Sequence, residues 1–302
     1  KKYIKKALNQ TDDLMCYGDP LGEKALRVAL QQYCHEFRGL SRPVDHYILG
    51  AGFQILLYHI CSLFKKDNLV GIEEGGFKQA EAVFHDCHMQ VVKLPVDDQG
   101  ITIEGLQRTN LKLLYLNSSS GGYHGHPIKQ QRRLEIINYA RANNVYIIED
   151  DHNGELKFNS KPIDAMSKLD NDRIFYIGSF SKLLLPSIRI SYMVLPNNLV
   201  SDFLLKVNDY HQTASKLEQL ALAMYIEDGQ LARHLKRLRK HYRFKGNYLL
   251  NELKKAFPNH HFELYETALK ITMAIEDDLI DYYIETAKRN NINVTKNSSN
   301  QL

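Results

Sequence analysis

Short apolar runs alternate with amphipathic stretches through the middle of the chain. The runs at 46–52, 68–74, 89–96, 111–117, 145–151, 173–180 and 189–196 have the length and apolar character of buried strands. Between them, 53–64, 78–87 and 128–144 place apolar residues at helical spacing. Buried strands separated by helices are typical of a mostly parallel sheet covered by helices. The pattern therefore predicts an α/β fold.

The pattern changes after residue 196. Residues 197–256 are mainly helical in pattern, and the stretch from Gln230 to Lys255 alternates apolar and basic residues, as in a long solvated helix with one buried face. HFELYE (261–266) and ALKITMAIE (268–276) predict strands of a smaller α+β lobe. We therefore expect an N-terminal arm and helix at 1–45, a large α/β domain at 46–210, and connecting helices with a small lobe at 211–302.

Composition narrows the class of protein. The 302 residues are 44% hydrophobic and 25% charged, as in a soluble globular protein, and the net charge of +4 gives no reason to expect nucleic-acid binding by this segment. Apolar stretches such as 53–64 are too short to span a bilayer, and no secretory signal opens the chain. The chain lacks an initial methionine and ends in a polar run, so we interpret it as part of a longer protein.

Cysteine usage points to a reducing compartment. The four cysteines form no CxxC pair and no spacing typical of a metal site, so we expect reduced thiols in a cytoplasmic protein. His85, Cys87 and His88 lie close together, but such tight spacing suits closed zinc coordination poorly. We expect no metal.

The candidate chemistry stands just after the predicted strands. In α/β sheets, ligands bind beyond the carboxyl ends of the strands. Gly50 and Gly52 follow the first strand and open a helix whose first amides can hold an anion. The acidic run 149–151 follows a second strand, and Gly-Ser-Phe-Ser-Lys at 178–182 follows a third. We expect a phosphate-binding turn, an acid and a lysine to converge on one edge of the sheet.

Three motifs identify a family. They are MCYGDPLGEKALR (15–27), IEDDHNGELKF (148–158) and GSFSKLLLPSIRISYMVLP (178–196). Together they resemble the fold-type I, aspartate-aminotransferase-like enzymes that use pyridoxal 5′-phosphate (PLP). More narrowly, the chain is similar to the C-terminal effector domain of MocR/GabR-type transcription regulators of the GntR family, among which a NorG-like regulator is one candidate. The resemblance implies a large domain with a mostly parallel sheet and a smaller α+β C-terminal lobe.

The resemblance assigns roles at the reactive end of the cofactor. Lys182 would form the Schiff base with the PLP aldehyde, and partial burial favours the neutral amine that this reaction needs. Asp150 would pair with the pyridinium nitrogen and keep it protonated. Phe77 occupies the place of the aromatic residue that stacks on the ring. A solvated surface lysine, a helix cap and a core aromatic are the respective alternatives.

The resemblance also assigns the phosphate site. Ser179, Ser181 and Arg189 would hold the phosphate together with the amides of Gly52, Phe53 and Gln54. Tyr17 aligns with a tyrosine that reaches the phosphate of the neighbouring subunit, which implies a homodimer with shared sites; a local turn residue is the alternative there.

Several positions depart from the family pattern. His152 stands where a tyrosine usually hydrogen-bonds the ring hydroxyl. The usual Pro-Ser/Thr-Gly turn becomes Tyr123-His124-Gly125, and Gly122 replaces an asparagine. Gln79 replaces an arginine that binds a substrate carboxylate in GabR-like domains. The arginine that usually binds the α-carboxylate lies beyond residue 302 or is absent.

These departures favour a sensor over a catalyst, because transamination needs a precisely positioned substrate acid. We expect PLP, or a small amine or amino-acid effector, to shift the population between two domain arrangements. DNA would bind through an N-terminal winged-helix domain that is not in this chain. The alternatives are a free-standing PLP-dependent aminotransferase acting on an amino acid and a 2-oxo acid, and a degenerate scaffold that no longer binds PLP.

Overall fold

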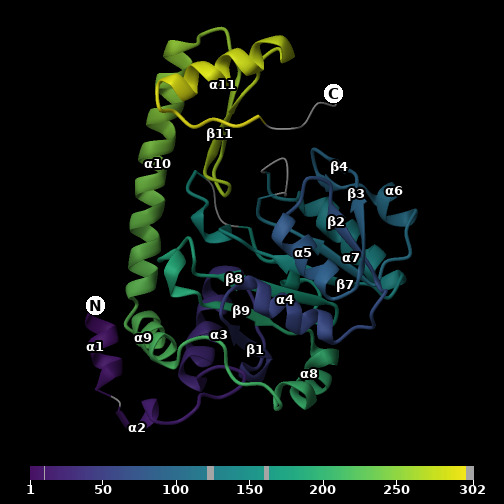
Figure 1. Ribbon diagram of the computed structural model, residues 1–302, viewed down its shortest axis with the longest axis vertical. Helices are drawn as coiled ribbons and strands as arrows, with labels where there is room; N and C mark the ends of the chain where they lie inside the picture. Colours follow the sequence, from purple (N-terminus) through teal and green to yellow (C-terminus); the bar gives the residue numbers. More distant parts are fainter. Residues whose placement is uncertain (10, 121–125, 160–162, 297–302) are drawn as a thin grey trace.

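A seven-stranded sheet forms the centre of the molecule in the computed structural model, which describes residues 1–9, 11–120, 126–159 and 163–296 (Figure 1). The strand order is β1-β9-β8-β7-β6-β2-β3. Neighbours from β8 through β3 pair in parallel, and β9 alone runs antiparallel, to both β8 and β1. The predicted α/β fold with a mostly parallel sheet is confirmed. The bounds are β1 Tyr47–Gly50, β2 Leu69–Glu73, β3 Gln90–Leu94, β6 Leu113–Leu116, β7 Tyr146–Asp150, β8 Ile174–Ser179 and β9 Ser191–Val194.

Helices cover both faces of this sheet. On one face, α4 (Phe53–Ser62), α5 (Lys78–Asp86) and α8 (Val200–Val207) pack on strand residues such as Ile72 and Ile148. The opposite face is covered by α3 (Lys24–Arg38) and α9 (Lys216–Glu227) at one end, and by α6 (Ile103–Gln107) and α7 (Gln130–Ala142) at the other. Because both faces are buried, the strands read as continuous apolar runs rather than as alternating ones.

The remaining elements surround this core. A small hairpin joins β4 (Val96–Asp97) to β5 (Gly100–Ile101), and α1 (Lys2–Leu8), which precedes α2 (Thr11–Leu14), packs against α9. Short 3₁₀ helices occupy Val44–His46, Gly154–Leu156, Met166–Lys168, Pro186–Ile188, Asn197–Leu199 and Asp277–Leu279.

The smaller lobe is carried on one long helix. Figure 1 shows α10 (Gln230–Ala256) rising from the sheet domain to the hairpin of β10 (Phe262–Tyr265) and β11 (Lys270–Met273) and to α11 (Ile280–Arg289). Only Leu231 and Leu235 of α10 are buried, as expected for a solvated helix. Of the helices described, none combines the length and the apolarity needed to cross a bilayer.

The pairing of β8 with β9 depends on a glycine. Gly178 lies opposite Tyr192, and the buried tyrosine ring lies over it: a Cβ on Gly178 would stand 2.3 Å from Cζ of Tyr192. A methyl group there would overpack the core, so Gly178→Ala should lower the free energy of unfolding by about 1–3 kcal/mol. Denaturant unfolding measures the effect.

Gly246→Ala in α10 is the matched control. A Cβ there meets Leu264 at an ordinary 3.4 Å, and alanine favours helix over glycine by about 0.5–1 kcal/mol. Equal effects of the two substitutions would contradict the tight packing of Tyr192 on Gly178.

Candidate functional site

A cavity opens at the carboxyl ends of β2, β6, β7 and β8. Its volume is about 730 Å³. Ten of the residues singled out in the sequence line it: Phe53, Gln54, Phe77, Gln79, Asp150, His152, Ser179, Ser181, Lys182 and Arg189. The segments that were expected to converge on one edge of the sheet therefore do so.

Lys182 reaches the cavity because β8 ends three residues before it. Phe180 precedes Lys182 and Leu183 follows it, and both side chains are buried, which anchors the turn. Burial lowers the pKa of the Lys182 ammonium, and the nearby Asp150 carboxylate opposes that shift. A lowered pKa increases the fraction of neutral amine, which is the nucleophilic form.

Asp150 ends β7 and is buried. Its Oδ2 accepts a 2.6 Å hydrogen bond from the hydroxyl of Tyr115, a residue of the adjacent strand β6. Burial raises the pKa of Asp150 to about 7, against the lowering effects of the Tyr115 hydrogen bond and the Lys182 charge. A cation placed against this carboxyl would favour its ionised form, because an opposite charge nearby lowers a carboxyl pKa.

Arg189 lines the cavity, and Gly52 lies directly against its guanidinium group, so the two form a corner at the edge of the cavity. Gly52 precedes α4 with φ 95°, and a Cβ on it would stand 2.3 Å from Nη2 of Arg189, so only glycine admits the guanidinium here. Arg189 itself has φ 48°, a strained conformation for a non-glycine residue that is typical of functional sites. The first turn of α4 has no side-chain cap, which leaves the amides of Phe53 and Gln54 available to an anion, whereas the Gly52 amide donates to the Gly50 carbonyl oxygen at 2.8 Å.

Three serine hydroxyls lie beside that corner. Ser179 Oγ donates to Ser181 Oγ at 3.1 Å and accepts from Ser191 Oγ at 3.2 Å. Ser191 is buried on β9, and the sequence analysis did not select it. Together with Arg189 and the start of α4, these hydroxyls make an anion-binding surface.

Phe77 and His152 complete the walls. Phe77 immediately precedes α5, is 46% exposed, and meets Phe53 edge-on at a ring-centroid distance of 5.6 Å. An exposed aromatic face at a cavity is suited to stacking on a flat ligand. Burial, with the Lys182 charge, lowers the pKa of His152 to about 4, so its imidazole is neutral at pH 7 and can donate or accept one hydrogen bond.

Two predicted features lie elsewhere. Tyr17 does not line the cavity; it is 88% exposed, and its ring stacks on His211 with centroids 5.0 Å apart. Its expected role in a neighbouring subunit stays a prediction. Gly122, Tyr123, His124 and Gly125 lie outside the described residues.

Sequence reasoning missed several lining residues, chiefly Glu73, Tyr115 and Asn117. Each stands in or just after a predicted strand whose carboxyl end meets the same edge as Asp150. Glu73 was visible as an acid at the end of an apolar strand, which is the signal that selected Asp150. Tyr115 lay inside an apolar run and gave no such signal.

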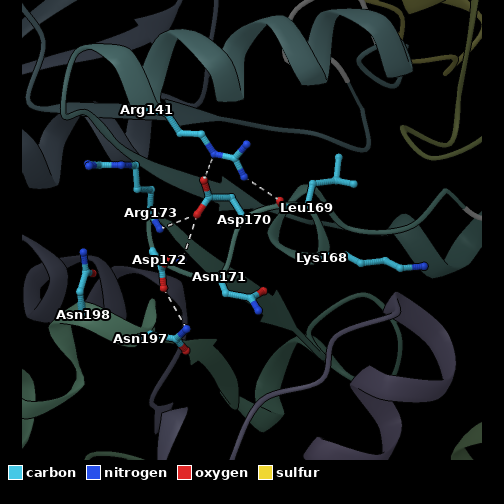
Figure 2. Close-up of a pocket in the computed structure, with 9 residues that line it drawn as sticks. All are labelled: Arg141, Lys168, Leu169, Asp170, Asn171, Asp172, Arg173, Asn197 and Asn198. Carbon is cyan, nitrogen blue, oxygen red and sulfur yellow. Dashed lines mark hydrogen bonds and ion pairs between the residues drawn. The ribbon is translucent and has the colours of Figure 1, made fainter.

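A second hollow lies at the opposite end of β8. Figure 2 shows its lining, including Arg141, Asp170, Asp172 and Asn197. These groups pair with one another: Arg141 Nε donates to Asp170 Oδ2 at 2.7 Å, and Asn197 Nδ2 donates to Asp172 Oδ1 at 2.9 Å. Its lysine, Lys168, donates to Asp164 Oδ2 at 2.6 Å and is paired in the same way. Throughout the described residues, no three His, Cys, Asp or Glu side chains gather as a metal site would require.

The comparisons with known proteins agree with this geometry. The family model "Aminotransferase class I and II" matches residues 1–297. The chain belongs to this family. The match confirms the predicted resemblance to fold-type I aminotransferases, whose cofactor is pyridoxal 5′-phosphate.

Several curated relatives are transcription regulators, and an aromatic-amino-acid aminotransferase of Thermococcus litoralis is also similar, at 22% identity over 80% of this chain. The HTH-type transcriptional regulator YdeL of Bacillus subtilis is 36% identical over 244 residues, which are 80% of this chain and 53% of YdeL. The probable rhizopine catabolism regulatory protein MocR of Rhizobium meliloti is 30% identical over 233 residues, 76% of this chain and 47% of MocR. The chain spans about half the length of these relatives. The predicted similarity to MocR-type regulators is confirmed, and the finer NorG-like resemblance stays a prediction.

The solved structures show the same fold. The kynurenine aminotransferase of Pyrococcus horikoshii, solved with PMP, superposes with a TM-score of 0.81 at 22% identity, covering 98% of this chain and 78% of that one.

Glu73 is an uncompensated acid in the cavity wall. It is 2% exposed, the Asn117 amide donates to its carboxyl group, and within the described residues its Oε1 has no hydrogen-bond partner. Burial raises the pKa of Glu73 to about 8, with a contribution from the Asp150 charge. We therefore expect Glu73 to keep a proton at neutral pH.

Replacing Glu73 should change how stability depends on pH. The folded pKa of about 8 exceeds the ordinary value of 4.5, so Glu73 favours folding while protonated, and that contribution is lost as pH rises from 4.5 through 8. Relative to Glu73→Gln, the free energy of unfolding of the wild type should fall by up to about 1.4 kcal/mol per pH unit in this window. Chemical denaturation between pH 5 and pH 9 measures it.

Glu74→Gln, at the exposed neighbouring position, is the matched control and should follow the wild-type profile. Parallel profiles for the wild type and Glu73→Gln would show that Glu73 ionises normally in the folded protein.

Proposed function

We propose that this chain is the PLP-binding, effector-sensing and dimerisation domain of a MocR-type transcription regulator. The observation that carries the proposal is the convergence of Lys182, Asp150 and the Gly52–Arg189 corner in one cavity. The regulator relatives support the sensing role, because the family alone includes enzymes as well.

The residues present fit the cofactor. When bound, PLP supplies an aldehyde that takes up amines and a ring that withdraws electrons. Gly52 and Arg189 leave a corner that a Cβ would fill, with serine hydroxyls and free helix amides beside it for a phosphate. Asp150 lies deeper, where its carboxyl group can hold the proton of a ring nitrogen.

The chain's own groups would divide the work as follows. Lys182 presents a partly neutral amine to the aldehyde carbon and accepts or releases the protons that move there. Phe77 covers the ring face and excludes water. His152 offers a neutral hydrogen-bonding group to the ring, in place of the usual tyrosine.

The substrate side of the cavity supports a sensor. Gln79 lines the wall where an arginine would bind a carboxylate, and an amide binds an anion more weakly than a guanidinium does. A small amine or amino-acid effector, or PLP itself, is therefore the proposed signal. The retained Lys182–Asp150 pair favours one second candidate, an aminotransferase acting on an amino acid and a 2-oxo acid.

Partners follow from the same proposal. We propose a homodimer in which Tyr17 of one subunit reaches the phosphate held by the other, and its exposure leaves it free for such a contact. DNA would bind through an N-terminal domain outside this chain, in the cytoplasm. The proposed protein is divided into an N-terminal arm and helix at 1–45, a large domain at 46–210, and connecting helices with the small lobe at 211–302.

The first test is cofactor binding. Adding PLP to the wild-type protein should produce a visible absorbance band, and reduction with borohydride followed by peptide mass mapping should mark Lys182. Lys182→Ala should lack both signals: Lys78 also lines the cavity, but Lys182 is the lysine whose charge acts on Asp150. Gly52→Ala should bind PLP about 10–100-fold more weakly, since it displaces Arg189 from the phosphate corner.

Lys168→Ala, on the hollow of Figure 2, is the control and should behave as the wild type. If Lys182→Ala still gave the visible PLP band, Lys182 would not be the residue that binds the aldehyde. Steady amino-group transfer to a 2-oxo acid by the wild type would favour the aminotransferase candidate over the sensor.

The second test concerns regulation. In the full-length protein, saturating PLP or effector should change the affinity for the regulated promoter by about 5–150-fold, the usual range of allosteric coupling. Lys182→Ala should bind the same DNA without responding to PLP. A gel-shift or anisotropy titration measures both, and an identical response in the two proteins would refute sensing through Lys182.

A further inference from the structure

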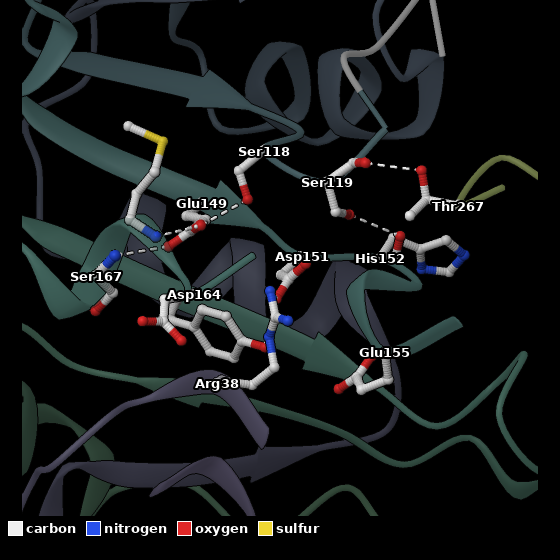
Figure 3. A network of polar contacts seen from close by, with 12 residues as sticks. Arg38, Ser118, Ser119, Glu149, Asp151, His152, Glu155, Asp164, Ser167 and Thr267 are labelled. Carbon is white, nitrogen blue, oxygen red and sulfur yellow. Dashed lines mark hydrogen bonds and ion pairs between the residues drawn. The ribbon is translucent and has the colours of Figure 1, made fainter. Parts of the chain in front are cut away.

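The tip of the small-lobe hairpin touches the loops behind the cavity. Thr267, between β10 and β11, is 3% exposed although it belongs to a lobe that is mostly solvated. Its Oγ1 donates to the carbonyl oxygen of Ser119 at 2.7 Å (Figure 3). Its own carbonyl oxygen accepts from Asn153 Nδ2 at 3.0 Å. Both hydrogen bonds are buried. One residue of the small lobe thus joins two separate loops of the large domain.

Those two loops are also joined to each other. Ser119 Oγ donates to the carbonyl oxygen of His152 at 3.0 Å, as Figure 3 shows. Asn117, Ser120 and His152 line the cavity, so every residue that Thr267 contacts is within two positions of a lining residue. The hairpin tip therefore lies directly behind the wall that faces the cavity.

A second set of contacts holds the same wall from outside. Glu266 Oε2 accepts from the backbone amides of Phe158 at 2.5 Å and Asn159 at 2.7 Å. From α10, Arg239 Nε donates to the Glu155 carbonyl oxygen at 2.6 Å, and Arg243 donates to the Phe158 carbonyl oxygen. The segment 152–159 thus lines the cavity at His152 and is hydrogen-bonded to the small lobe and to α10 along the rest of its length.

The loop needs such support. Asn153 adopts φ 72°, in the left-handed region, and its side chain donates to Thr267. A loop held in a sparsely populated conformation persists only when its surroundings fix it. Without the Thr267 hydroxyl, the buried Ser119 carbonyl would lose its side-chain donor and pay the desolvation cost of an unpaired group.

We propose that Thr267 is a positioning residue that couples occupancy of the cavity to the order of the small lobe. A ligand that fixes Asn117, Ser120 and His152 fixes Ser119 and Asn153 with them, and Thr267 carries that restraint to β10, β11 and α10. The inference rests on the proposed cofactor site and adds the route by which that site acts on the rest of the chain. The coupling arises because the cavity and the small lobe share these hydrogen bonds, so that ordering one of them favours ordering the other.

Thr267→Val tests the coupling, because valine keeps the shape and removes only the donor. In the wild type, PLP should slow amide hydrogen exchange of the segment 262–273 by about tenfold, as expected when local opening is suppressed. In Thr267→Val that protection should disappear, while the visible band still forms at saturating PLP with an affinity about 3–10-fold weaker. Thr267→Ser retains the hydroxyl and should restore the wild-type protection.

The outcomes separate the two proposals. If PLP protects the hairpin equally in the wild type and in Thr267→Val, the coupling is overturned and the cofactor site stands. The same holds if the wild type shows the visible PLP band but no protection of the hairpin. Absence of the band in the wild type would remove the cofactor site and the coupling with it. If Thr267→Val fails to fold, Glu266→Gln tests the coupling instead. It weakens the hydrogen bonds to the amides of Phe158 and Asn159 and should reduce the protection of 262–273 by PLP; unchanged protection would overturn the coupling.

Discussion

Three consecutive carboxyl groups are buried where β7 ends, and the site exists because each has a different partner. Strand alternation turns Asp150 toward the cavity and its two neighbours toward the opposite face. Glu149 accepts from Ser118 Oγ at 2.6 Å and from the amides of Met166 and Ser167 at 2.8 Å each. Asp151 pairs with Arg38 (Figure 3) and accepts from the hydroxyl of Tyr176 at 2.9 Å. Burying three acids side by side is tolerable only with all these partners present.

This arrangement ties distant segments to one point of the sheet. Arg38 ends α3, so its pair with Asp151 fixes α3 under the site, and removing either partner would leave a charge uncompensated in the core. The Glu149 bonds fix the loop after β6 and the 3₁₀ helix that begins at Met166. Within the part of the chain that the structure describes, the Asp150 carboxyl group accepts one side-chain hydrogen bond, from Tyr115, and its other side faces the cavity. Each neighbour is paired inside the protein, although Asp151 Oδ1 has no hydrogen-bond partner among the described residues, and the middle acid remains for a ligand.

The features of the fold and site that the sequence predicts are those with a local pattern of apolar and polar residues. The apolar runs located the seven strands of the main sheet within a few residues, because strands buried on both faces are apolar along their whole length. The motif at 178–182 and the acid at 150 were found because polar residues directly after such strands stand out. The antiparallel direction of β9 carries no local signal, since direction depends on the connections and not on composition. Tyr115 was missed for a related reason: a tyrosine inside an apolar strand gives no sign that its hydroxyl meets an acid on the next strand.

Contacts between lobes were beyond any local pattern. Thr267 is one threonine in a turn, and only the fold brings it to Ser119, 148 positions away. The same holds for Gly52 and Arg189, whose mutual fit appears only when α4 and the loop after β8 meet. Such long-range contacts are what distinguish two uses of one cofactor fold. A catalyst must hold the substrate as firmly as the cofactor, whereas a sensor must connect the cofactor site to the rest of the chain. In this molecule one wall of the cavity offers Gln79, whereas the segment that follows His152 is hydrogen-bonded to the small lobe and to α10. This distribution of contacts fits the proposed sensor.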